Sequence, residues 1–164
     1  MKTNKYTCLI IDDEFHCREL LAYKISKFVA DLDILEKISN INDALVYLKN
    51  NEAPDIIFLD LELPGVNGFD FLENVKTITS QIIITSAYEK YALKTIKFHV
   101  VDFLLKPIND IELVDTIKYV KTKIYKPEIL EEIKLTPKET IVLQLMAKGL
   151  LNKEIADQIN IGLS

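Results

Sequence analysis

The chain has few of the residues that build secreted, membrane-bound or disordered proteins. Its 164 residues include two cysteines, too few for a disulfide framework. Four glycines and five prolines leave little room for long disordered linkers. No apolar run approaches the roughly 20 residues of a membrane span, and residues 1–6 lack the apolar core of a signal peptide. We therefore expect a cytoplasmic protein with no membrane partner.

Basic residues are also in the minority. The formal net charge is −5 and the sequence pI is near 5.1, which argues against a broadly basic nucleic-acid surface. The composition, 49% hydrophobic and 27% charged, is ordinary for a globular protein. A chain of this length holds one domain with a good core and a small appendage. We interpret Cys8 and Cys17 as small buried hydrophobes.

Two periodicities alternate along the first 120 residues or so. Short, nearly continuous apolar runs predict strands over residues 6–11, 32–39, 56–59, 81–85 and 101–105. Apolar stripes at helical spacing predict helices over residues 14–28, 41–49, 68–76, 88–97 and 109–119. Short connections between strand–helix pairs favour an α/β fold, a parallel sheet covered on both faces. We predict a doubly wound five-stranded sheet of order 2-1-3-4-5.

Polar residues close these apolar runs. Asp12 and Asp13 end the first predicted strand, Asp60 the third, Ser86 the fourth, and Lys106 the fifth. In doubly wound sheets, ligands bind beyond the carboxyl ends of the strands. An ionised side chain at the end of a buried strand is costly unless something compensates or uses it. We therefore expect these side chains to form a site.

The residue types at this edge suit phosphoryl chemistry. Carboxylates that share an edge repel each other unless they take up protons or a cation, and oxygen ligands suit Mg²⁺. A metal there lets the Asp60 carboxylate attack phosphorus, while Lys106 and Ser86 bind phosphoryl oxygens. Each feature alone has a simpler interpretation: the Asp pair or Ser86 as a helix cap, Asp60 or Lys-Pro as part of a turn. Their joint placement at successive strand ends favours the site.

These motifs resemble the receiver domain of two-component response regulators, which is flavodoxin-like. The resemblance covers residues 6–122 and rests on Asp12-Asp13, Asp60 followed by Leu-Pro-Gly, Ser86-Ala, and Lys106-Pro. It implies that Asp60 accepts a phosphoryl group from the phosphohistidine of a sensor histidine kinase. It also implies that Asp13, Asp60 and the backbone carbonyl of Glu62 hold Mg²⁺ (or Mn²⁺), while Asp12 orders its waters.

The resemblance further implies a switch. Phe103 matches the aromatic position that turns inward when Ser86 moves toward the phosphoryl group, and a homodimer is expected on phosphorylation. Glu62 and Tyr88 flank the site and are expected to tune the lifetime of the phosphoryl group. The family also implies a cis Lys106-Pro107 bond.

Two histidines lie near this pattern. Where related receivers commonly have Gly-Ala, this chain has His99-Val100, which leaves the shape of that loop open. His16 beside the acidic pair is interpreted as a solvated residue, because Mg²⁺ prefers oxygen ligands.

The C-terminal stretch carries a second resemblance. Thr136, Pro137 and Glu139 form the start of a predicted helix, and residues 135–139 and 148–156 together resemble the start of a LuxR-type helix-turn-helix. Ser164 falls where we expect the recognition helix to begin, so we predict a small, incomplete helical unit. Three lysines balance three acids from Leu135 onward, and we expect DNA binding only through a full-length output domain.

We predict a receiver over residues 1–122, a linker or helix extension over 123–134, and the partial helix-turn-helix over 135–164. The predicted function is a phosphorylation-switched transcriptional regulator rather than an enzyme. The alternative is a receiver that acts through protein–protein contacts without DNA binding. A phosphatase with an aspartyl nucleophile is less favoured, because such families usually have a second Asp two residues after the first, where this chain has Glu62. A nucleotide-binding enzyme is less favoured because the Asp-Asp-Glu loop repels phosphate in the absence of a metal and lacks a phosphate-binding glycine motif.

Overall fold

The structure is a computed structural model that describes residues 6–65, 68–98, 100–124 and 141–142. The chain divides into two compact units, Met1–Tyr125 and Lys126–Ser164. The described residues up to Ile124 belong to the first unit. In the second, Ile141 and Val142 are described, and both are helical. Within the described residues, no helix is long and apolar enough to cross a membrane.

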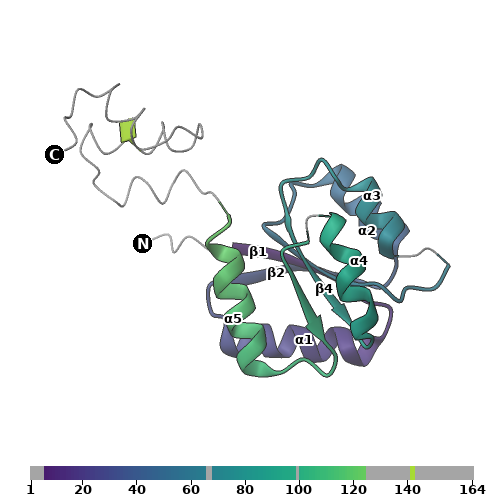
Figure 1. The fold of residues 1–164 in the computed structure, drawn as a ribbon, viewed down its shortest axis with the longest axis horizontal. Coiled ribbons are helices and arrows are strands. Elements are labelled where there is room, and N and C mark those ends of the chain that lie inside the picture. Colours follow the sequence, from purple (N-terminus) through teal and green to yellow (C-terminus); the bar gives the residue numbers. More distant parts are fainter. Residues whose placement is uncertain (1–5, 66–67, 99, 125–140, 143–164) are drawn as a thin grey trace. The chain divides into compact units, whose positions relative to one another are not determined.

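Five parallel strands form one sheet in the order β2-β1-β3-β4-β5, as predicted (Figure 1). The strands are β1 (Tyr6–Ile11), β2 (Leu32–Ile38), β3 (Ile56–Asp60), β4 (Gln81–Ser86) and β5 (Asp102–Leu105). Every residue of β3 is buried, which explains its continuous apolar sequence. In register, Leu59 of β3 lies beside Ile11 of β1, and Asp60 beside Thr85 of β4. The polar residues that end these strands therefore meet at one edge.

Two helices cover one face of the sheet. They are α1 (Phe15–Phe28) and α5 (Asp110–Lys121), side by side in Figure 1. Lys24 ties them together, donating to the carbonyl oxygen of Ile108 at 2.6 Å and pairing with Asp110 at 2.6 Å. The apolar faces of both helices pack against the sheet in one core. The helices contribute Leu21, Ala22, Ile25, Leu113, Ile117 and Val120, and the strands contribute Cys8, Ile10, Ile56, Phe58 and Ile83.

The other face carries α2 (Ile41–Asn50), α3 (Gly68–Asn74) and a short helical segment (Figure 1). That segment, residues 89–98, consists of η1 (Glu89–Tyr91), α4 (Ala92–Thr95) and η2 (Ile96–Phe98). The second core lies beneath these helices, and its members include Leu9, Ile57, Leu59, Phe71, Leu72 and Ile84. Full burial of each such side chain contributes about 1.5–3 kcal/mol to folding.

The fourth helix differs from its prediction. A continuous helix was expected over residues 88–97, but the α-helical part has four residues between two 3₁₀ turns. Short helices are marginal on their own, and the β-branched Thr95 and Ile96 further lower helical preference. The other elements start or end within two residues of the predicted positions.

The loop after β3 depends on two glycines. Gly65 has a φ of +82°, a left-handed conformation that non-glycine side chains rarely adopt. At Gly68 an added Cβ would lie 2.8 Å from the Cα of Leu61, so the backbones approach too closely for any other residue without a shift. The Lys106-Pro107 bond is cis, as the resemblance implied.

Several predictions lie outside the described residues. They include the His99 loop, most of the linker over residues 123–134, and the helix starts at Thr136 and beyond. The domain boundaries therefore stay predictions.

Candidate functional site

The polar strand ends converge as predicted. Asp60 is the last residue of β3 and Ser86 the last of β4, and both side chains are buried. Asp12 and Asp13 follow β1, and Lys106 follows β5. Lys106 is held beside β4 by its backbone N–H, which donates to the carbonyl oxygen of Ser86 at 2.8 Å. The parallel register thus brings residues almost 100 positions apart to one sheet edge.

Three carboxylates form a cluster at this edge. Asp12, Asp13 and Asp60 each offer an oxygen, and these atoms lie within 4.8 Å of one another. The Asp13 Oδ1 atom is buried and has no hydrogen-bond partner among the described residues. A buried carboxylate oxygen without a partner is costly, and a cation would satisfy it. The donor set, oxygen only, fits Mg²⁺.

Lys106 bridges two members of the cluster. Its Nζ lies 2.5 Å from Asp60 Oδ2 and 2.8 Å from Asp12 Oδ2. Burial lowers the pKa of Lys106, but hydrogen bonds to both carboxylates and their charges outweigh it, so the pKa lies above its ordinary value. Burial also raises the pKa of Asp12, a shift that Lys106 opposes and the charge of Asp60 reinforces. Lys106 thus stays charged beside two buried acids.

Backbone N–H groups fix the orientation of the buried carboxylates. Asp60 Oδ1 accepts from the N–H of Glu62 at 2.9 Å, while its Oδ2 faces Lys106. Asp12 Oδ1 accepts from the N–H of Glu14 at 2.9 Å. The N-cap of α1 is Glu14, and its side chain makes no capping bond. The simpler interpretation of the acidic pair as the cap of this helix therefore does not describe the structure.

The remaining predicted residues surround this centre. Ser86 Oγ accepts from the N–H of Tyr88 at 3.1 Å. Tyr88 is half-exposed, and Phe103 is partly buried against the second core. Glu62 is exposed, and its pKa is raised by desolvation and by the charge of Asp60. The structure thus places Glu62 and Tyr88 at the rim and Phe103 one strand away, beside Ile84.

His16 is not a member of the acidic cluster. It is exposed, and its ring lies 5.6 Å from the ring of Phe15, measured between centroids. Its exposure agrees with its interpretation as a solvated residue.

Sequence reasoning missed two contributors. Arg18 donates to the backbone carbonyl of Asp12 at 2.5 Å and so holds the loop after β1. A mainly apolar pocket of about 330 Å³ also opens beside Lys106, lined in part by Cys17, Leu20, Thr85 and Pro107. Cys8 is buried as predicted, but Cys17 is only partly buried, because it faces this pocket. Helical spacing alone does not show which side of a stripe lines a pocket.

Comparisons with known proteins identify the class. Residues 8–118 match the family model described as "Response regulator receiver domain", and residues 134–162 match "Bacterial regulatory proteins, luxR family". The first match covers most of the chain, so the protein belongs to the response regulators and contains a receiver domain. The predicted receiver followed by a LuxR-type helix-turn-helix is confirmed as a sequence assignment.

Individual relatives are response regulatory, sensory transduction or transcriptional regulatory proteins by name. The chain is 33% identical over 140 residues to the transcriptional regulatory protein DesR of Bacillus subtilis, covering 80% of this chain and 70% of DesR. It is 34% identical over 129 residues to the sensory transduction protein LytT of Bacillus anthracis, covering 77% of this chain and 52% of LytT. The chain thus spans about half the length of several curated relatives, including LytT.

One solved relative bears on the acidic cluster. The response regulator TrrA of Thermotoga maritima, in complex with Mg²⁺-BeF, aligns with a TM-score of 0.62 at 26% identity, covering 70% of this chain and 98% of that one. The presence of Mg²⁺ there is a property of TrrA.

Proposed function

We propose that Asp60 is the phosphoryl acceptor of a two-component response regulator. The observation that carries this proposal is the pairing of a buried Asp60 with Lys106, beside the Asp13 Oδ1 atom, which has no hydrogen-bond partner in the described part of the chain. A carboxylate buried among like charges is poised to react with an electrophile that brings its own counter-ion. A phosphoryl donor with Mg²⁺ is such an electrophile.

The chemical step follows from this geometry. A carboxylate oxygen of Asp60 forms a bond to phosphorus while the phosphorus–nitrogen bond of the kinase phosphohistidine breaks, and the released imidazole takes up a proton. Lys106 Nζ moves from the carboxylate to a phosphoryl oxygen. Asp13, Asp60 and the Glu62 carbonyl would hold Mg²⁺, with Asp12 beside them to order its waters, and the ion would supply positive charge to the phosphoryl oxygens. The chain thus promotes a transfer to itself and does not turn over an external substrate.

The switch starts at Ser86. In the resting arrangement its hydroxyl accepts from the N–H of Tyr88. Phosphorylation adds about −1.5 to −2 charge, and the Ser86 hydroxyl turns to donate to a phosphoryl oxygen. Phe103 then turns toward the vacated space, and the changed surface of β4, β5 and the adjoining helices supports a homodimer. Glu62 and Tyr88, at the rim, set the access of water to the phosphoryl group.

The proposed output is transcriptional. The LuxR-family match over residues 134–162 and the similarity to the transcriptional regulatory protein DesR support regulated DNA binding. The proposed location is the cytoplasm. The domain scheme remains as predicted: a receiver over 1–122, a linker over 123–134, and an output unit from 135. A receiver that works through protein contacts alone remains the second candidate. Phosphorylation-dependent retention of promoter DNA would favour the first.

Incubation with acetyl phosphate and Mg²⁺, followed by intact mass measurement, tests the core proposal. We expect a gain of one phosphoryl group that is lost in Asp60→Asn. Asp115→Asn is the matched control, because Asp115 is an exposed aspartate of α5. Unchanged labelling of Asp60→Asn would overturn the proposal.

A further inference from the structure

A groove separates α3 from the segment that contains α4. Phe69 of α3 and Tyr91, Lys94, Lys97 and Phe98 of the segment line it, and its volume is about 510 Å³. We call these five residues the α3–α4 groove. It lies on the face of the sheet away from α1 and α5, and its lining includes no residue of the acidic cluster. The proposed phosphoryl chemistry leaves it unused.

Aromatic rings form the floor of the α3–α4 groove. The Phe69 ring lies 5.9 Å from that of Tyr91 at 67°, and 5.6 Å from that of Phe98 at 40°. All three residues are partly buried and pack against the second core. An apolar floor anchored on the core offers a fixed site for one aromatic or aliphatic side chain.

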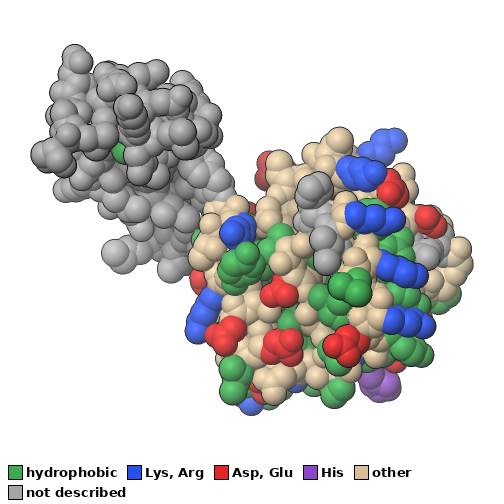
Figure 2. Space-filling view, viewed as in Figure 1, with side chains coloured by type: hydrophobic (Ala, Val, Ile, Leu, Met, Phe, Trp, Pro, Cys, Tyr) green, Lys and Arg blue, Asp and Glu red, His purple; other side chains and the backbone are tan. Residues whose placement is uncertain are grey.

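Lysines gather along the wall of the groove. Residues 88–98 contain three lysines against one glutamate, in a chain whose net charge is −5. Figure 2 shows basic side chains in a column on the side where Figure 1 places α4. Among the described residues, no carboxylate lies within ion-pair distance of Lys90, Lys94 or Lys97. Their charges are therefore available to a partner.

The lysine ammonium groups instead lie over rings. Lys90 Nζ lies 4.8 Å from the Tyr88 centroid and 5.1 Å from that of Tyr91, and Lys97 Nζ lies 5.1 Å from that of Phe98. Because lysines lie over two of the rings that line the groove, its floor has room for one side chain but not for the successive stacked bases of a single-stranded nucleic acid. A carboxylate can instead approach each ammonium from outside, so the arrangement favours an acidic peptide over a single-stranded nucleic acid.

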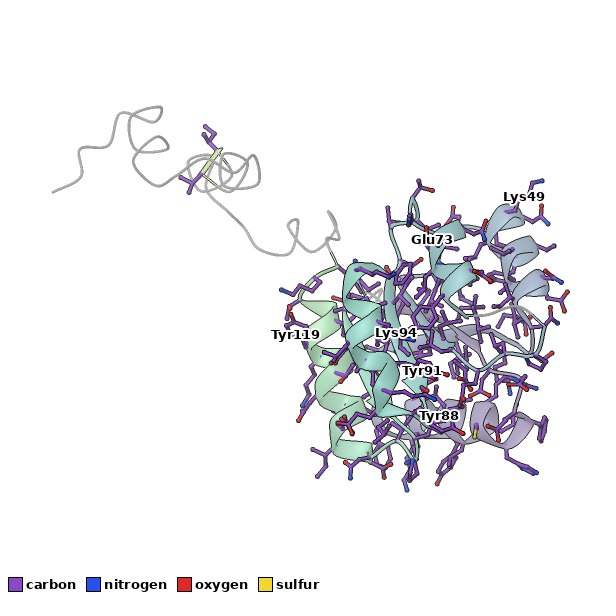
Figure 3. The ribbon with its side chains drawn as sticks, turned by 45° about the vertical axis from the view of Figure 1, so that its right-hand side comes forward. Lys49, Glu73, Tyr88, Tyr91, Lys94 and Tyr119 are labelled. Carbon is purple, nitrogen blue, oxygen red and sulfur yellow. The ribbon has the colours of Figure 1, made fainter. Side chains whose placement is uncertain are left out.

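We propose that the α3–α4 groove docks an acidic segment of a partner protein, with one apolar side chain on the aromatic floor and flanking carboxylates on Lys94 and Lys97. Charge complementarity carries the assignment, because the groove is locally positive on an acidic chain. Both lysines are exposed, and Lys94 projects beside Tyr91 in Figure 3.

A series of ring contacts links this groove to the proposed phosphoacceptor site. The N–H of Tyr88 is held by Ser86 Oγ, the Tyr88 ring lies 6.1 Å from that of Tyr91, and Tyr91 contacts Phe69. Figure 3 shows Tyr88, Tyr91 and Lys94 in succession along one segment. Movement of Ser86 releases Tyr88 at one end of this series. This link rests on the proposed function, and it makes docking and phosphorylation influence each other reciprocally.

Fluorescence anisotropy on the 164-residue chain tests docking with a defined probe. The probe is a short fluorescein-labelled peptide in which aspartates and glutamates flank one phenylalanine. We expect saturable binding that weakens about tenfold in Lys94→Glu/Lys97→Glu, because two attractive charge contacts become repulsive. The control Lys49→Glu/Lys118→Glu makes the same charge change on α2 and α5 and keeps wild-type affinity. A probe with serine in place of phenylalanine binds more weakly.

Four results would overturn the docking proposal. They are no saturable binding, an equal loss in both double variants, stronger binding of a single-stranded oligonucleotide than of the peptide, and self-association of the chain that Lys94→Glu/Lys97→Glu abolishes. The link to phosphorylation is read separately. With acetyl phosphate and Mg²⁺ the peptide affinity changes in the wild type and stays constant in Asp60→Asn. Constant affinity in a wild-type chain shown by mass to be phosphorylated removes the link and leaves docking intact.

Discussion

Two aspartates bracket β3, and their surroundings differ. Asp55 precedes the strand; its Oδ2 accepts from the N–H and hydroxyl of Thr7 at 2.8 and 3.1 Å. The N–H of Asp55 in turn donates to the Thr7 hydroxyl at 3.1 Å. Asp60 ends the strand, five positions later, and faces Lys106 and two further carboxylates. One residue type therefore serves two purposes on one strand.

The difference lies in what satisfies each charge. Asp55 accepts hydrogen bonds from the backbone N–H and the hydroxyl of Thr7, and these bonds tie the start of β3 to β1. Asp60 is held by one backbone N–H and by a long, flexible lysine that it shares with Asp12. A shared cation can move to a new anion, whereas a backbone donor cannot. A buried aspartate thus becomes reactive when its counter-ion is mobile and its neighbours have the same sign of charge.

The largest expected effect comes from substituting each of these two aspartates in turn. Asp60→Asn abolishes labelling by acetyl phosphate and does not lower the free energy of unfolding, because it relieves repulsion while Lys106 keeps Asp12. Asp55→Ala retains labelling but costs about 1–3 kcal/mol of stability, because the Thr7 donors lose their acceptor. Intact mass and urea unfolding measure the two effects. Lost labelling in a folded Asp55→Ala chain would contradict the comparison.

The second effect concerns the mobile cation. Lys106→Gln slows labelling about 10- to 100-fold, as expected from the loss of a charge-assisted hydrogen bond to the phosphoryl group. Lys118→Gln, at an exposed lysine of α5, leaves the rate unchanged. Time courses by mass spectrometry with matched Mg²⁺ concentrations give both rates. Equal rates for the two variants would show that Lys106 serves stability alone.

Metal removal gives the third effect. EDTA stops labelling, and Mg²⁺ at 100 times its dissociation constant stabilises the wild type by about 2.7 kcal/mol. Asp13→Asn loses most of this stabilisation, because it replaces the carboxylate whose buried oxygen has no partner among the described residues. Thermal unfolding with and without Mg²⁺ measures the difference. Asp115→Asn responds to Mg²⁺ as the wild type does, and the same response in Asp13→Asn would exclude Asp13 as a ligand.

The smallest expected effect is a pH dependence of stability due to Cys8, which lies beside Ile56, the residue after Asp55. Burial, together with the charge of Asp33, raises the pKa of the Cys8 thiol from 9.0 to about 12. Above pH 9 the unfolded thiol ionises while the folded one does not, so stability falls between pH 9 and about 12. The slope due to Cys8 reaches about 1.4 kcal/mol per pH unit, and it is absent in Cys8→Val. Urea unfolding at pH 8 and pH 10 compares the two chains, and equal losses would contradict the burial effect.

The sequence predicts the sheet and the acceptor well, for a physical reason. Parallel strands buried on both faces need continuous apolar runs, so residues 56–59 mark a central strand, and the polar residue that ends such a run lies at the sheet edge. Once the order is 2-1-3-4-5, the register brings Asp12, Asp60 and Lys106 together. Family motifs add the expected role of each residue.

Finer features depend on tertiary contacts that a one-dimensional pattern does not contain. Lys106 forms ion pairs with both Asp12 and Asp60, and this sharing depends on side-chain positions. The α3–α4 groove forms because Phe69 meets a distant segment, and neither stretch is unusual by itself. The broken fourth helix and the partial exposure of Cys17 likewise depend on local packing.

Gly68 sets a limit on how this site can vary. Only a hydrogen atom fits between its Cα and the backbone of Leu61, and the Gly68 N–H donates to the carbonyl oxygen of Leu61 at 3.4 Å. Leu61 is the neighbour of Asp60 in the chain, so a single methyl group at position 68 would shift the acceptor without altering any charge. Mutations that change the lifetime of the phosphoryl group are therefore expected at Glu62 and Tyr88, because these exposed positions have room for other side chains.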